Sequence, residues 1–295
     1  MACILKIPSK ASKGIVIFTS QEKSKIIAAD QNLQKRIRLF KDKWIFGVHH
    51  NWQDHKFEYN DLYDFEIAGE KYLIERNDKR LNRLELSAAN FVPNNFRFSK
   101  NNKFWDILYV GRSVHFKKIP DFFSAIRKLY DDGKMYRVLF ISPIHPECKK
   151  NKSISSNFCN IVESYEKMFT SKEREYFNLL TLDYDYPFPF DLDTLSHFYK
   201  SSRVFVFTSD DEMRPRTVGY AIASGLPIVV RESISYMLPK DIRKAPFIYV
   251  AKDKDFFPKL IDKAIKFSNS KDYNKLSMKA SVDEFNNNCN KEKMR

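Results

Sequence analysis

HFYKSSRVFVFTSDDEMRPRTVGYAIASGLPIVV, residues 197–230, alternates two apolar runs with one helical pattern. The apolar runs RVFVFTS at 203–209 and PIVVRE at 227–232 have the continuous hydrophobic character of strands that are buried on both faces. RTVGYAIAS at 216–224 lies between them and has the spacing of a helix. A strand, a helix and a second buried strand in this order predict a parallel sheet covered by helices.

The same alternation extends in both directions from this stretch. Further strands are predicted at 105–111, 136–142 and 179–182, and further helices at 119–130, 155–168, 193–202, 257–265 and 272–285. We therefore expect a doubly wound α/β domain over residues 105–285 and a frayed tail at 286–295.

The first third of the chain has a looser pattern. Strands are predicted at 14–18, 43–49 and 84–93, and an amphipathic helix at 24–39. An Asn- and Lys-rich segment at 93–103 is the predicted linker. The first domain is accordingly expected to cover residues 1–104.

Composition limits the classes of function. None of the 295 residues belongs to an apolar run long enough to span a membrane, and we expect a cytoplasmic protein. The 7 glycines match neither a P-loop nor a dinucleotide fingerprint. The 4 cysteines lie far apart, so neither a disulfide framework nor a zinc site is expected. The net charge of +14 suggests an anionic partner, but it is spread along the chain and does not by itself predict nucleic-acid binding.

Charged residues follow two of the predicted strands. VGRSVHFKK at 110–118 places Arg112, Lys117 and Lys118 after the first, and TSDDEMRPR at 208–216 places a group of Asp, Glu and Arg residues after the second. Ligands of parallel sheets bind beyond the carboxyl ends of the strands, where helix N-termini attract anions. Two such loops facing one crevice would suit a sugar linked to a diphosphate.

These two segments resemble a known family. GRSVHFKKIPDFFSAIRKL at 111–129 resembles the GR-x4-K-x3-DL-x-AI segment of retaining glycosyltransferase family 4, and residues 197–230 resemble its LY-x-SADVFV-x-PS-x2-EGFP-x-V-x2-EAMA-x-GLPVV segment. The two segments occur in the order that the family has. The resemblance covers about residues 105–285 and implies a GT-B fold of two Rossmann-like domains, with the N-terminal domain reduced in size.

The resemblance also implies roles for individual residues. Arg112 and Lys117 would bind the donor diphosphate, where fixed cations stabilise the charge that grows on the leaving nucleotide. Glu212 matches the first Glu of the family's E-x7-E motif, which contacts sugar hydroxyls. Arg216 and Thr217, at the start of the following helix, are further donor-binding candidates.

The chain departs from the family at three positions of this loop and helix. Tyr220 replaces the second Glu of the motif, which usually contacts the ribose, and a phenol cannot accept from both ribose hydroxyls as a carboxylate does. Met213 and Arg214 replace the Gly and Phe that follow the first Glu. Tyr220 is either a donor-binding residue with one hydrogen bond or a packing residue.

Two histidines in the first domain are candidate catalytic residues. His49 and His50 follow the predicted strand at 43–49, and a histidine at such a point in related enzymes often lies near the donor sugar. The alternative is a loop histidine pair with no ligand. LELSAANFVPNNF at 84–96 resembles the family's strand before the inter-domain linker and supports the boundary near residue 104.

These features together predict a retaining glycosyltransferase. The donor would be a nucleotide-diphosphate sugar, and the acceptor a glycan or a lipid-linked intermediate; no metal and no other cofactor is expected, because basic side chains and a helix N-terminus would take the place of a divalent ion. The basic surface would favour peripheral association with an anionic membrane. The alternatives are a catalytically degenerate nucleotide-sugar-binding protein and a basic glycosyltransferase that modifies nucleic-acid bases.

Overall fold

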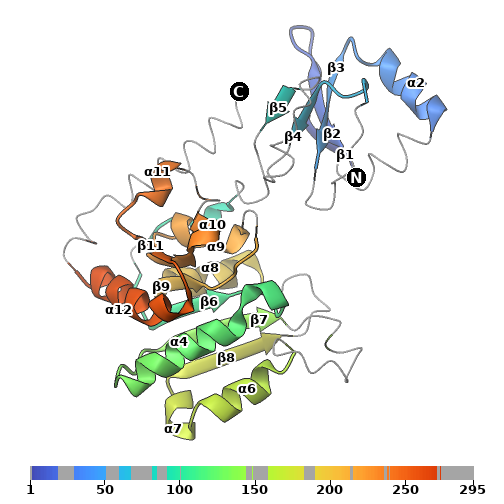
Figure 1. Cartoon of the computed structure of the whole chain (residues 1–295). Helices are drawn as coiled ribbons and strands as arrows, with labels where there is room; N and C mark the ends of the chain where they lie inside the picture. The colour runs from blue at the N-terminus through green and yellow to red at the C-terminus, as the bar shows by residue number, and fades with distance from the viewer. Residues whose placement is uncertain are drawn as a thin grey trace. The chain divides into compact units, whose positions relative to one another are not determined.

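The computed structural model divides the chain into two units, Met1–Ala88 (unit 1) and Ala89–Arg295 (unit 2). Figure 1 shows both units. The residues that the structure describes are 2–18, 30–50, 60–67, 82–84, 92–99, 101–143, 148, 159–182, 190–212, 215–235, 238, 240–270 and 273.

Unit 2 is built on a parallel sheet. Its described strands are β6 (Trp105–Val110), β7 (Val138–Pro143), β8 (Phe177–Leu182), β9 (Ser202–Phe207), β10 (Ile228–Arg231) and β11 (Ile248–Ala251). They lie in the order β8-β7-β6-β9-β10-β11, and every neighbouring pair is parallel. The first strand along the chain is therefore central, and the winding reverses between β6 and β9, which is where ligands bind in sheets of this topology.

Helices connect the strands and cover both faces of the sheet. The α-helices of unit 2 are α4 (Ile119–Asp131), α6 (Ile161–Met168), α7 (Ser171–Arg174), α8 (Leu192–Lys200), α9 (Arg216–Ala223), α10 (Glu232–Ser235), α11 (Lys240–Arg243) and α12 (Phe257–Ser268), and its 3-10 helices are η3 (Asn94–Phe96), η4 (His115–Lys117) and η5 (Lys254–Phe256). Helices α4 and α12 contact each other over one face, and α8 and α9 contact each other over the other (Figure 1). Within the described part of the chain, no helix has the length and apolar character needed to cross a bilayer.

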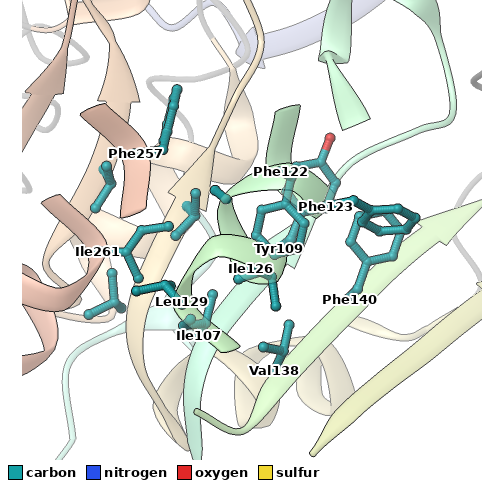
Figure 2. Packing of buried hydrophobic residues seen from close by; sticks show 14 of the residues in the cluster. Ile107, Tyr109, Phe122, Phe123, Ile126, Leu129, Val138, Phe140, Phe257 and Ile261 are labelled. Carbon is teal, nitrogen blue, oxygen red and sulfur yellow. The ribbon is translucent and has the colours of Figure 1, made fainter. Parts of the chain in front are cut away.

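The core follows from the two-residue period of the strands. Ile107 and Tyr109 of β6 point into the cluster under α4 and α12, whereas Leu108 and Val110 point into the cluster under α8 and α9. Figure 2 shows the first cluster, in which the ring of Tyr109 stacks on that of Phe140 with centroids 4.6 Å apart. Because both faces are buried, the central strands are apolar throughout, and the loops at their ends are left to carry the polar groups.

Unit 1 has a smaller sheet. Its described elements are β1 (Ala2–Lys6), β2 (Gly14–Phe18), α2 (Gln31–Leu39), β3 (Trp44–His49), β4 (Phe65–Ile67) and β5 (Asn82–Leu84). The strands follow chain order in the sheet, with β1 antiparallel to β2 and the others parallel. Asp30 caps α2 by accepting from the backbone N–H groups of Asn32 and Leu33, 2.9 and 3.0 Å away.

The predicted fold class is confirmed, and the central elements lie close to their predicted positions. Strands β1, β4 and β11 are not predicted by the sequence pattern. Residues 24–29 of the helix predicted at 24–39, residues 85–91 of the strand predicted at 84–93, residues 155–158 of the helix predicted at 155–168, nearly all of the helix predicted at 272–285 and the tail at 286–295 lie outside the described residues. Within the predicted linker, Phe96 is fully buried in the unit 2 cluster that contains α8 and α9.

The expectation of no disulfide is wrong at one position. Cys148 and Cys159 form a disulfide, with Cα atoms 5.2 Å apart, in the connection from β7 to α6. The 11-residue separation matches no motif, so the sequence alone does not indicate that these two cysteines pair. Cys3, by contrast, is a free and exposed thiol.

Candidate functional site

The loops that follow β6 and β9 meet at the carboxyl ends of these neighbouring strands. The β6 loop, residues 111–118, contains Arg112 and Lys117, and the described part of the β9 loop, residues 208–212, contains Glu212. The Nζ of Lys117 donates to Oε2 of Glu212, and the two form an ion pair. Because β6 and β9 flank the point where the winding reverses, this ion pair lies where an anionic ligand is expected.

Hydrogen bonds to main-chain carbonyls join the two loops. The Thr208 hydroxyl donates to the carbonyl of Lys117 over 2.8 Å, and the Ser209 hydroxyl donates to the carbonyl of Phe116 over 3.0 Å. The backbone N–H of Asp210 donates to the same Phe116 carbonyl, also over 3.0 Å. The main chain of residues 116 and 117 is therefore held in place by the β9 loop.

The Lys117 ammonium lies in a dry environment. Its side chain is 7% exposed, against 29% for that of Glu212, and Nζ lies 4.4 Å from the centre of the Phe207 ring. Burial lowers the pKa of Lys117, the Glu212 carboxylate opposes this shift, and the charge of Arg112 adds to it. Arg112 and Lys117, the two cations predicted for the donor diphosphate, both lie in the β6 loop.

A second ion pair lies beside the first. Lys118 Nζ is 3.0 Å from Asp210 Oδ2, and both side chains are about 40% exposed. The backbone of Lys118 is left-handed, with φ of 49°, at the junction between η4 and α4. Asp210 is thus the partner of a lysine from the facing loop.

Arg231, at the end of β10, contacts both the β9 loop and the first turn of α4, and it is not among the residues predicted from the sequence. Its Nε donates to the Thr208 carbonyl over 2.7 Å, and its Nη2 pairs with Asp121 in the first turn of α4. Its guanidinium also lies 5.6 Å from the centre of the Phe257 ring. The sequence feature that could have identified Arg231 is its position directly after the buried run PIVV, at the same sheet edge as the two loops.

Helix α9 carries the remaining candidates of unit 2. Arg216 is exposed in its first turn, and the Thr217 hydroxyl is buried without a hydrogen-bond partner in the described structure. Tyr220 is 9% exposed, and its ring stacks on that of Phe96 with centroids 4.1 Å apart and an interplanar angle of 17°. The ring of Tyr220 is thus a packing residue, as one of the two alternatives expects, while a contact of its hydroxyl with ribose stays a prediction. Residues 213 and 214 lie outside the described residues.

One of the two candidate histidines, His50, lies in a buried network of unit 1. His50 directly follows β3, and its Nε2 is 2.9 Å from Oε2 of Glu66 in β4. Arg83 in β5 places its Nη2 2.6 Å from the other carboxylate oxygen, Oε1. Burial acts to raise the pKa of Glu66, but the hydrogen bonds from His50 and Arg83 outweigh it and lower that pKa. His49 is half-buried. This network gives His50 a structural role, and the catalytic roles of both histidines stay predictions.

The groups at the β6–β9 edge suit an anion better than a metal ion. Arg112 and Lys117 are cations, and Glu212 is the carboxylate between the loops that pairs with one of them. Among the described residues, His, Cys, Asp and Glu side chains nowhere gather in a group of three able to hold a metal ion.

Comparison with known proteins identifies the fold. No protein-family model and no curated protein matches the sequence. Among solved structures, the Glycosylation Associate Protein (Gap123) complex from Streptococcus agalactiae matches with a TM-score of 0.52 at 13% identity, over 94% of this chain and 52% of that chain. TarM matches with a TM-score of 0.51 at 13% identity, over 93% and 51% of the two chains. The fold is of the GT-B type.

A third solved structure with the same architecture is the GtfA/B complex, with a TM-score of 0.50 at 13% identity, over 88% of this chain and 52% of that chain. This GT-B chain spans about half the length of the solved structures that it matches. In its unit 2, the strand order places Lys117 and Glu212 where the winding of the sheet reverses.

Proposed function

We propose that this protein is a glycosyltransferase that moves a sugar from a nucleotide-diphosphate donor to a glycan or lipid-linked acceptor, with retention of configuration. The observation that carries the proposal is the placement of Lys117 and Glu212 at the β6–β9 edge, with the charge of Arg112 acting on the same ammonium. The GT-B fold, which TarM shares, supports it.

Each group has a chemical task in this reaction. Negative charge grows on the diphosphate as the bond between sugar and phosphate breaks, and Arg112 and Lys117 stabilise that charge. Because Lys117 is buried, its field is screened less than that of a surface lysine. Glu212 accepts hydrogen bonds from sugar hydroxyls and orients the sugar. Arg216 and Thr217 bind the donor at the start of α9. His49 and His50 are the catalytic candidates of unit 1.

The test is a screen of the purified full chain against UDP-, GDP-, ADP- and CMP-sugars, with thermal shift and nucleotide release as readouts. We expect one nucleotide sugar to stabilise the protein and to be cleaved slowly. Lys117→Ala and Glu212→Ala should lose both effects, whereas the matched exposed-site variant Asp211→Ala should keep them. Absence of binding to every donor would reject the proposal.

A second candidate is a nucleotide-sugar-binding protein without turnover. The stacking of Tyr220 on Phe96 favours it, because an aromatic residue packed in the core occupies the position where the family has its second Glu. Binding of a nucleotide sugar without release of nucleotide, in the presence of mixed glycan and lipid-linked acceptors, would select this candidate.

A further inference from the structure

The ion pair between Lys117 and Glu212 places a carboxylate where the proposed ligand would place a phosphate. Lys117 needs a counter-charge whether or not a ligand is bound, since an unpaired ammonium in a dry environment is costly. Glu212 provides that counter-charge in the free protein. A diphosphate at the same ammonium must therefore compete with Glu212.

The two partners differ in their freedom to move. Lys117 is 7% exposed, and its carbonyl accepts a hydrogen bond from Thr208 over 2.8 Å. Glu212 is 29% exposed, and the only ion pair that its carboxylate makes with a described residue is the one with Lys117. A partly exposed carboxylate regains water when it leaves its partner, whereas a buried ammonium does not. Exchange of partners thus moves Glu212 and leaves Lys117 in place.

We infer that Glu212 is an exchangeable counter-ion: it holds the anion position at Lys117 in the free protein, yields it to the diphosphate of the donor, and is then available to the sugar hydroxyls. The substrate role of this carboxylate rests on the proposed function; the exchange itself requires only that the site accept a diphosphate. After transfer, the return of Glu212 to Lys117 promotes release of the nucleoside diphosphate.

This exchange makes the site selective for a diphosphate that carries a sugar. Inorganic pyrophosphate displaces Glu212 and has no hydroxyl that could hydrogen-bond the displaced carboxylate. Its binding free energy is therefore reduced by the loss of the ion pair between Glu212 and Lys117. A nucleotide sugar compensates the displaced carboxylate with hydrogen bonds. Removing the charge of Glu212 should therefore strengthen pyrophosphate binding and weaken nucleotide-sugar binding.

The experiment measures inorganic pyrophosphate binding to the full chain by isothermal titration calorimetry at pH 7. We expect Glu212→Gln to bind about tenfold more tightly than the wild type, as loss of a charge-assisted interaction of about 1.5 kcal/mol predicts. Asp211→Asn is the matched control, because it removes the same charge from the neighbouring, exposed position. It should bind within about twofold of the wild type.

Three results would overturn the inference: no gain in Glu212→Gln, an equal gain in Asp211→Asn, or no pyrophosphate binding by any of the three proteins. Circular dichroism checks that Glu212→Gln is folded. If it is not folded, Glu212→Asp replaces it; this variant shortens the carboxylate side chain and should bind pyrophosphate with an affinity between those expected for the wild type and for Glu212→Gln. If the gain is found but no nucleotide sugar binds, the exchange stands and the proposed donor is rejected.

Discussion

Arg231 donates a hydrogen bond from Nε to the carbonyl of Thr208, 2.7 Å away. Thr208 in turn donates from its hydroxyl to the carbonyl of Lys117 over 2.8 Å. The end of β10 is thereby connected, through the end of β9, to the main chain of the lysine at the candidate site. Arg231 also pairs with Asp121 in the first turn of α4, so its guanidinium joins the β9 loop to the helix that follows the β6 loop.

Arg231→Met should loosen this connection. Hydrogen bonds to charged groups contribute about 1.5–3 kcal/mol each, so we expect a loss of about 2–3 kcal/mol in the free energy of unfolding. Affinity for the nucleotide ligand should fall about tenfold, because Thr208, whose hydroxyl holds the Lys117 carbonyl, loses the hydrogen bond from Arg231. Arg231→Lys should lose less stability and less affinity than Arg231→Met. Chemical denaturation and ligand titration measure the two effects, and an unchanged affinity in Arg231→Met would show that β10 does not position the site.

Lys117→Met should separate binding from stability. Burial makes the charged ammonium costly, and an apolar side chain of similar length removes that cost, while the partly exposed Glu212 regains water. We expect the melting temperature to stay the same or rise and nucleotide-sugar binding to be lost. Lys118→Met, at an exposed ion pair, is the control for loss of charge. A large drop in melting temperature in Lys117→Met would mean that the ion pair is mainly structural.

Tyr220 allows its ring and its hydroxyl to be tested separately. Tyr220→Phe keeps the ring against Phe96 and should leave the melting temperature within about 2 °C of the wild type. If the hydroxyl contacts ribose, as predicted, nucleotide affinity should fall about fivefold, which is typical for one neutral hydrogen bond. Tyr220→Glu restores the family's carboxylate but buries a charge, and should cost about 2–4 kcal/mol. If Tyr220→Phe binds the nucleotide as tightly as the wild type, the only role of Tyr220 is packing.

Glu173 predicts a pH dependence of stability. Both of its oxygens accept from Arg127, at 2.5 and 2.7 Å, and the hydrogen bonds from Arg127 lower the pKa of Glu173 to about 2. Because the pKa is lowered on folding, the stabilisation is complete above the ordinary value of 4.5 and is lost as pH falls from there towards 2.

Glu173→Gln should therefore lose about 1–2 kcal/mol at pH 7 and be no less stable than the wild type near pH 2. Urea denaturation between pH 2 and 7 measures this difference. Glu163→Gln, which removes a carboxylate from an exposed pair with Lys167 in α6, should change stability little at any pH. A Glu173→Gln deficit that did not vary with pH would contradict the assignment.

The parts of unit 2 that the sequence predicts well are those whose local pattern reflects burial on both faces. RVFVFTS and PIVVRE are continuous apolar runs because β9 and β10 lie between two layers of helices, and α4 has apolar residues at helical spacing because one of its faces is buried. The three residues of β4 and the four of β11 are too short to show a period, so their place in the sheets depends on neighbouring strands.

The sequence predicts which loops form the candidate site, but it does not predict the contacts between their side chains. The family pattern places Lys117 and Glu212 at the ends of two strands, but it does not say that they pair with each other. Arg231 comes from a third strand and donates to the main-chain carbonyl of Thr208. Because every residue has such a carbonyl, the sequence near Thr208 does not indicate this hydrogen bond. The Cys148–Cys159 pairing is missed for a related reason, because it depends on the path of the chain between the two residues.

The stacking of Phe96 on Tyr220 joins two positions that lie far apart in the chain. Each ring provides the other with a flat partner surface, so loss of the ring at one position weakens the packing of the ring at the other. In an alignment of relatives, positions 96 and 220 should therefore co-vary: chains with a carboxylate at the second should lack a ring at the first. An evolutionary step from that state to the present one, or its reverse, requires two substitutions, and the intermediate with only one of them would be the less stable protein.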